Sequence, residues 1–134
     1  MTTYFADTWY FIARVDQSDQ HHTRALSLER RLIDSRFLTH DYVLGEFLTY
    51  FSGEGARARA RAVEMVRMTR RSHEVVESNF LLFESALERY AHRLDKEYSF
   101  VDCMSMVVME YRGIMNVLTN DHHFRQEGFR VVNE

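Results

Sequence analysis

The chain contains no proline and only one cysteine, Cys103, among its 134 residues. A single cysteine excludes an internal disulfide, which fits a reducing compartment such as the cytoplasm. We interpret Cys103 as a small buried hydrophobe rather than a nucleophile, because it lies within an apolar stretch. No low-complexity linker or internal repeat divides the chain, and its length suffices for one domain with a substantial core. We therefore expect a single domain over residues 1–134.

Long apolar runs are also missing from the sequence. None reaches the roughly 18 residues that a membrane-spanning helix needs. The start, "MTTYFADTW", lacks the positive residues, apolar stretch and small-residue cleavage site of a secretory signal. The composition, 46% apolar and 28% charged residues, is ordinary for a soluble globular protein. We expect a cytoplasmic protein with no membrane partner.

Strand-like and helix-like segments alternate along the chain. The patterns predict strands at 2–6, 36–40, 73–78, 114–119 and 129–132. They predict helices at 9–15, 21–33, 42–51, 56–71, 79–94 and 100–112, and a short helical turn at 121–127. Thr8 and Asp41 are expected to cap the helices that follow them. This alternation indicates an α/β fold with a parallel sheet covered on both faces.

Four carboxylates stand where such a topology would gather them, because the loops after parallel strands meet at one edge of the sheet. Asp7 directly follows the first strand, and Asp121 follows the fourth. Asp102 lies in the first turn of the helix that leads into the fourth strand. Glu46 lies in the second turn of the helix after the second strand. We expect all four side chains at the same rim.

A divalent cation would explain why these acids tolerate one another. Close carboxylates repel, and at neutral pH some would take up protons. Mg²⁺ or Mn²⁺ prefers oxygen ligands, keeps several waters and can lower the pKa of a bound water. Local explanations stay open beside this one: Asp102 forms a capping box with Ser99, Asp7 ends a strand, Glu46 is solvated, and Asp121 caps the short turn.

Arginines are concentrated in one segment, although the net charge of −3 does not suggest a nucleic-acid partner. Residues 57–71 hold six arginines against one acid, Glu64. This segment has three interpretations: binding of RNA phosphates, a solvated helix paired with acids, or contact with an acidic partner. Two histidine pairs, at 21–22 and 122–123, lack zinc-ligand spacing, and we expect them to lie on the surface or contact RNA.

Four stretches carry a resemblance to a known family. They are "FADTWYFIARVDQSDQHH" at 5–22, "LTHDYVLGEFLT" at 38–49, "DKEYSFVDCMSMVVM" at 95–109 and "LTNDHHFRQEGF" at 118–129. In order and spacing they resemble PIN-domain nucleases of the kind typified by VapC-like toxins of type II toxin–antitoxin systems. The resemblance implies a three-layer α/β/α fold around a mostly parallel sheet of about five short strands, and Mg²⁺- or Mn²⁺-dependent endoribonuclease activity.

The resemblance also implies roles for individual residues. Asp7, Glu46, Asp102 and Asp121 match the family's acidic quartet, with Asp7 and Asp102 as the firmest metal ligands. Asp121 would complete the site or hold a second ion, and Glu46 would position or deprotonate the attacking water. Thr8 matches a hydroxyl position beside the first acid.

Partners follow from the same resemblance. The family typically forms homodimers and is blocked by an antitoxin segment near the active site. Apolar side chains of the arginine-rich helix are candidates for either contact: Val63, Met65, Val66 and Met68. Residues 53–94 match the family weakly. Two other functions stay open, a PIN-fold RNA-binding module without turnover and a stand-alone RNA-processing nuclease with no antitoxin.

Overall fold

The computed structural model describes residues 1–134 and contains one five-stranded sheet in the order β3-β2-β1-β4-β5. Every neighbouring pair is parallel. The strands are β1 (Thr3–Ala6), β2 (Arg36–His40), β3 (Glu74–Val76), β4 (Asn116–Leu118) and β5 (Arg130–Val132). The α/β fold with a parallel sheet, predicted from the sequence, is confirmed.

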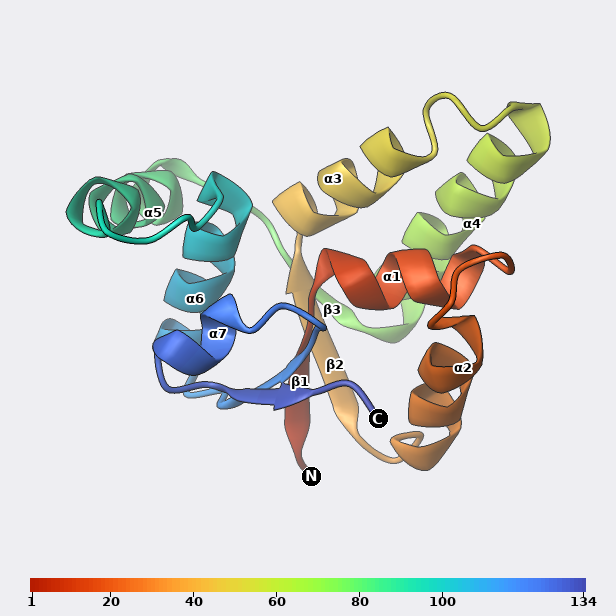
Figure 1. Ribbon diagram of the computed structural model, residues 1–134, viewed down its shortest axis with the longest axis horizontal. Coiled ribbons are helices and arrows are strands. Elements are labelled where there is room, and N and C mark those ends of the chain that lie inside the picture. The colour runs from red at the N-terminus through yellow and green to blue at the C-terminus, as the bar shows by residue number, and fades with distance from the viewer.

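Seven helices surround this sheet. They are α1 (Thr8–Val15), α2 (His22–Arg31), α3 (Asp41–Tyr50), α4 (Ala56–Ser72), α5 (Phe80–His92), α6 (Phe100–Arg112) and α7 (His123–Gln126). Figure 1 shows α1, α2 and α4 on one side of the sheet and α5 and α6 on the other. Parallel strands are buried by helices on both faces, which is why the predicted crossover helices occupy two layers. No helix is both long and apolar enough to cross a membrane.

The core forms where the central strands meet α1, α3 and α6. Phe5 of β1 and Val117 of β4 are fully buried, as are Phe47 of α3 and Met106 of α6. Central strands are enclosed on both faces, so their residues read as continuous apolar runs rather than as an alternation. Cys103 is likewise fully buried, as expected of a small hydrophobe.

Two predicted helix caps differ from those in the structure. Thr8 is the first residue of α1 rather than its cap, because the cap position belongs to Asp7. Asp41 begins α3, whereas His40 occupies the cap position and its ring nitrogen accepts a bond from the Val43 amide. The Asp41 carboxylate instead accepts bonds from the amide and hydroxyl of Ser78. In both places the side chain that the local pattern assigns to the cap bonds to a residue distant in sequence, Glu46 for Thr8 and Ser78 for Asp41.

Candidate active site

Asp7 reaches the sheet edge because the first strand ends one residue earlier. Its backbone amide donates to the carbonyl of Leu118, and Ala6 pairs with Leu118 in the parallel register of β1 and β4. The next residues on the two strands, Asp7 and Thr119, are therefore neighbours, and Thr119 Oγ1 donates to Asp7 Oδ2 at 2.7 Å. Asp7 makes no side-chain capping bond and is only 6% exposed. Its carboxylate thus faces the pocket while most of its surface is shielded from water.

Glu46 approaches from the helix that follows β2. Since β2 lies beside β1, the helices that follow them, α3 and α1, pack together, and Thr8 Oγ1 at the start of α1 donates to Glu46 Oε1 in the second turn of α3 at 2.5 Å. Thr8 is buried, whereas Glu46 is exposed. The hydroxyl therefore fixes a flexible, solvent-accessible carboxylate over the pocket.

Asp102 is held at the start of α6 by a reciprocal capping box. The Asp102 amide donates to Ser99 Oγ at 3.0 Å, and the Ser99 amide donates to Asp102 Oδ2 at 3.3 Å. The carboxylate also benefits from the positive end of the helix dipole. The local capping role that the sequence predicts is present, and it orients the side chain toward the pocket.

Asp121 follows β4 in a turn that its own neighbours stabilise. Its amide donates to Thr119 Oγ1, and its Oδ1 accepts a 2.9 Å bond from the His123 amide. The carboxylate therefore supports the first turn of α7, as one of the local interpretations predicts. Thr119 contacts both Asp7 and Asp121, so one hydroxyl links the two acids that follow the central strands.

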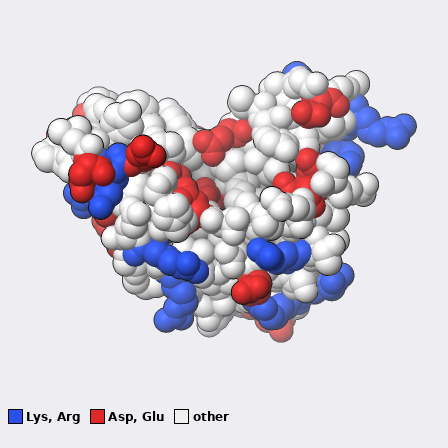
Figure 2. Space-filling model, in the orientation of Figure 1, with Lys and Arg blue, Asp and Glu red and all other residues white.

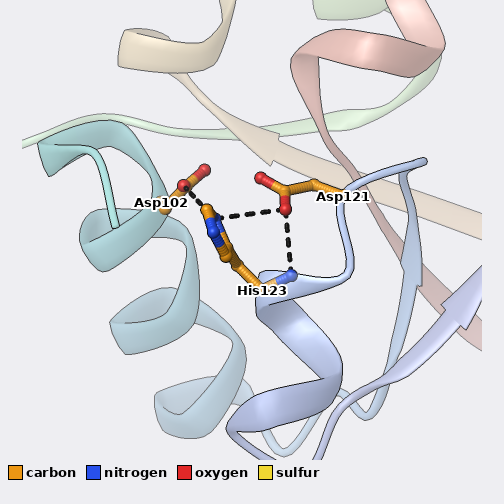
Figure 3. A group of neighbouring side chains, drawn as sticks. All are labelled: Asp102, Asp121 and His123. Atoms are coloured by element: carbon orange, nitrogen blue, oxygen red, sulfur yellow. Dashed lines mark hydrogen bonds and ion pairs between the residues drawn. The ribbon is translucent and has the colours of Figure 1, made fainter. Parts of the chain in front are cut away.

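His123 lies between two of the acids, where sequence reasoning did not place it. Its Nδ1 is 3.2 Å from Asp121 Oδ1 and 3.8 Å from Asp102 Oδ2 (Figure 3). That nitrogen is buried and has no hydrogen-bond partner. The preceding His122 is exposed. The two rings are neighbours, with centroids 5.0 Å apart, but only His123 contacts the acids. The Asp-x-His spacing at 121–123 is the sequence signal that could have identified His123.

The predicted acids line one pocket of about 400 Å³. Its lining contains no lysine or arginine and consists of Asp7, Trp9, Glu46, Ser99, Asp102, Thr119, Asn120 and Asp121. Figure 2 shows acidic side chains in the hollow between the α5 side of the molecule and the side formed by α3 and α4. A groove of about 480 Å³ between α5 and α6 is larger, but it has no comparable set of acids.

Burial and mutual repulsion change the acidity of two of these groups. The pKa of Asp7 rises from 3.8 to about 7, chiefly because burial disfavours the charged form, and the Asp102 and Glu46 charges raise it further. The hydroxyl of Thr119 acts in the opposite direction. The pKa of Asp102 is also raised, first by burial and then by the charge of Asp121. The protein itself therefore supplies too little positive charge to balance these carboxylates.

A divalent cation fits this set of donors. Single atoms of Asp102, Asp121 and His123 all lie within 4.8 Å of one another. Carboxylate oxygens are the preferred ligands of Mg²⁺ and Mn²⁺, and an imidazole nitrogen is a further donor that transition metals accept. The buried Nδ1 of His123 supports the fit, because it lies close to two carboxylates and makes no hydrogen bond, whereas a buried polar atom normally makes one.

The arginine-rich helix α4 is solvent-exposed and partly paired with an acid, as one of the three interpretations predicted. All six of its arginines are exposed, and Arg71 pairs with Glu64 at 3.1 Å. Arg59 and Arg61 donate to the backbone carbonyls of Ser52 and Val15. On the opposite side, Met65 and Val66 belong to the core, so these two side chains are not available to a partner as the sequence analysis suggested. Val63 remains exposed.

Comparison with known proteins gives a consistent result. A family model described as the PIN domain matches residues 4–129. The 23S rRNA-specific endonuclease VapC20 of Mycobacterium tuberculosis is 32% identical over 134 residues, with 96% of each protein covered. The crystal structure of Mycobacterium tuberculosis VapC20, a Sarcin-Ricin loop cleaving toxin, gives a TM-score of 0.86 at 27% identity, covering 99% of this chain and 100% of that one. The DNA-bound VapBC of Salmonella typhimurium, at 19% identity, TM-score 0.66 and 98% of each chain covered, shares the fold.

Proposed function

Because the chain belongs to the PIN-domain family, we propose that it is a metal-dependent endoribonuclease that hydrolyses RNA phosphodiester bonds. The observation that carries this proposal is the convergence of four carboxylates, from segments far apart in sequence, on one pocket without a balancing cation. The 32% identity to an enzyme named for cleavage of 23S rRNA makes ribosomal RNA the favoured substrate class.

The residues of the pocket suit distinct roles in such a reaction. Asp7, Asp102 and Asp121 would hold Mg²⁺ or Mn²⁺. When bound, such an ion lowers the pKa of water and neutralises charge on the phosphodiester. Glu46, kept in place by Thr8, would position or deprotonate the water that attacks phosphorus in line. The products would carry a 5′-phosphate and a 3′-hydroxyl.

The biological setting in this proposal is a toxin of a type II toxin–antitoxin pair. Support comes from the similarity to VapC20 and to a VapC protein solved with its VapB partner. The proposed partners are the RNA substrate, a cognate antitoxin and a second copy of the chain, and the proposed location is the cytoplasm. We further propose that residues 1–134 form one PIN-like domain.

Cleavage assays with single carboxylate variants test the catalytic proposal. Asp7→Asn and Asp102→Asn should each abolish cleavage of ribosomal RNA while the circular dichroism spectrum stays native, because each removes a charge from the proposed metal site. Asp34→Asn, a change at an exposed acid outside the pocket, should retain activity. EDTA should stop the reaction, and added Mg²⁺ or Mn²⁺ should restore it. Full activity in either pocket variant, or in excess EDTA, would overturn the proposal.

Expression in growing cells tests the toxin role separately. Induction of the wild-type chain should arrest growth, and Asp7→Ala should relieve the arrest. Co-expression of a small reading frame found directly upstream of the gene should also relieve it. An active nuclease that leaves growth unaffected would instead favour a stand-alone RNA-processing enzyme.

A further inference from the structure

Trp9 is the one apolar residue among those that line the acidic pocket. It is the only tryptophan in the chain and the second residue of α1, two positions after Asp7. Trp9 is only partly buried, and the buried part of its side chain packs against the hydrophobic core. An aromatic surface is therefore held by the rigid first turn of a helix directly beside the proposed metal ligands.

A second aromatic ring extends this surface. His21, from the turn before α2, places its ring centroid 5.6 Å from that of Trp9, with an angle of 58° between the two planes. His21 is itself partly buried. Tilted aromatic pairs at this separation attract one another, so His21 limits the motion of the indole. The histidine pair at 21–22 thus contributes one member that packs against a residue of the pocket wall.

Stability alone does not explain why a tryptophan occupies this position. The indole Nε1 is buried and has no hydrogen-bond acceptor. Buried indole N–H groups usually have a partner, and an unsatisfied donor costs about 1–3 kcal/mol. Phenylalanine would supply an aromatic ring without that donor. A larger π surface facing the pocket is the property that tryptophan adds.

The charge of the pocket indicates what this surface contacts. RNA must bring a phosphate close to four carboxylates, and no lysine or arginine lines the pocket. The proposed cation attracts the phosphate only at the metal site, so binding energy that does not depend on charge would help to hold the neighbouring nucleotide beside the acids. Stacking of an unpaired base on an aromatic side chain contributes about 1–3 kcal/mol and tolerates any base. A volume of about 400 Å³ is in the range of small-molecule sites and suits a nucleotide.

We propose that Trp9, supported by His21, is a stacking platform for an unpaired RNA base next to the phosphodiester that is cleaved. The inference rests on the proposed nuclease function and adds a residue that binds the substrate. Stacking would add binding energy that does not depend on charge to the attraction between the proposed cation and the phosphate. The inference also predicts that the contribution of Trp9 is independent of salt, unlike that of phosphate contacts made by arginines.

Intrinsic fluorescence provides a direct test, because the chain has a single tryptophan. The full-length Asp102→Asn variant, in the presence of Mg²⁺, is titrated with a twelve-nucleotide single-stranded RNA of mixed sequence that it should bind without cleaving. Stacking should quench the Trp9 emission with saturation. RNA binding measured by anisotropy with no change in tryptophan emission would overturn the inference.

Substitutions then separate stacking from a structural role. In the same background, Trp9→Leu should weaken RNA binding by about 5- to 150-fold, and by the same factor at low and high salt. Trp9→Phe should weaken binding less and leave the urea midpoint unchanged or higher, because it removes the unpaired donor. Tyr111→Leu, a change at a residue that is 89% exposed at the far end of α6, is the matched control and should bind normally.

The two proposals fail in distinguishable ways. Unchanged affinity in Trp9→Leu, or a loss that disappears at high salt, refutes stacking even if the wild-type chain cleaves RNA with Mg²⁺. A wild-type chain that never cleaves RNA refutes the nuclease. In that case, fluorescence quenching still decides whether Trp9 contacts a base.

Discussion

Asp7→Asn should stabilise the metal-free protein at alkaline pH while it abolishes activity. The pKa of Asp7 is raised from 3.8 to about 7 by burial and by the neighbouring Asp102 charge. An unfolded chain releases this proton near pH 4, whereas the native protein keeps it until about pH 7. The native state therefore binds more protons between these limits, and its stability falls as the pH rises through them. Asparagine has no charge to bury, so the Asp7→Asn variant does not lose stability in this way as the pH rises.

The size of the loss in stability follows from the rise in the pKa of Asp7. Each unit of pKa corresponds to about 1.4 kcal/mol, so the cost of ionising Asp7 in the native state approaches roughly 4 kcal/mol above pH 7. Between pH 5 and pH 8 the change is about 3 kcal/mol. These values are upper limits, because local relaxation and water entry reduce the cost of a buried charge.

Urea denaturation in EDTA, at pH 5 and pH 8, measures this quantity. Other titrating groups affect both proteins, including buried His40, whose pKa is lowered to about 4 and which destabilises the native state as the pH falls below 6.5. The difference between Asp7→Asn and wild type cancels such contributions. The free energy of unfolding of Asp7→Asn should exceed that of the wild type by an amount that increases as the pH rises. Parallel pH profiles for the two proteins would refute the reasoning.

Added Mg²⁺ provides the control for this prediction. A cation that binds the ionised carboxylates stabilises the native state by mass action. It should raise the urea midpoint of the wild-type protein at pH 8 and have little effect on Asp7→Asn. Equal stabilisation of both proteins would show that the ion binds elsewhere.

Three further predictions concern the support of the pocket. Thr119→Val removes the bond that lowers the pKa of Asp7, so the acid limb of the pH–rate profile for RNA cleavage should move to higher pH; an unmoved limb contradicts this. Ser99→Ala breaks the capping box and should lower the free energy of unfolding by about 1 kcal/mol in urea titrations, whereas Ser99→Thr should not. Arg89→Met removes one of the two arginines that pair with Glu127, which keeps Arg93 at 3.1 Å and the Tyr98 hydroxyl at 3.0 Å, and should cost about 2 kcal/mol by the same measurement, partly recovered in the double variant with Glu127→Gln.

Local sequence signals predicted most of the elements correctly. The Ser99-x-x-Asp102 spacing predicted a capping box, which the structure contains. The helix predicted at 100–112 ends at Arg112, and Gly113 adopts a left-handed conformation with φ of 66° directly after it. Such signals succeed because capping and periodicity involve residues only a few positions apart.

The placement of the four acids near one another was also predictable. A parallel sheet carries the residues after its strands to one edge whichever strands are neighbours. Asp7, Glu46, Asp102 and Asp121 all line the same pocket as expected. Their roles as metal ligands and catalytic groups remain predictions, which the assays above test.

Contacts between distant segments could not be predicted in this way. The bond from Thr8 to Glu46 joins positions 38 residues apart, and Thr119 lies 112 residues from Asp7. Both depend on the strand order, which the alternation of strands and helices does not specify. Local pattern also predicted Thr8 and Asp41 as helix caps. In the structure their side chains instead bond to Glu46 and Ser78, which are distant in sequence.

The amino-acid sequence was thus sufficient to specify an α/β chain, its helices and strands, and the rim on which its carboxylates gather. Only the folded molecule decided that Asp7 is buried enough to raise its pKa, that His123 rather than His122 meets the acids, and that Trp9 lines their pocket. The physical reason is the distance along the chain over which each interaction acts. Helix and strand formation depend on near neighbours, whereas desolvation, repulsion between charges and the shape of a pocket depend on every segment that packs around them.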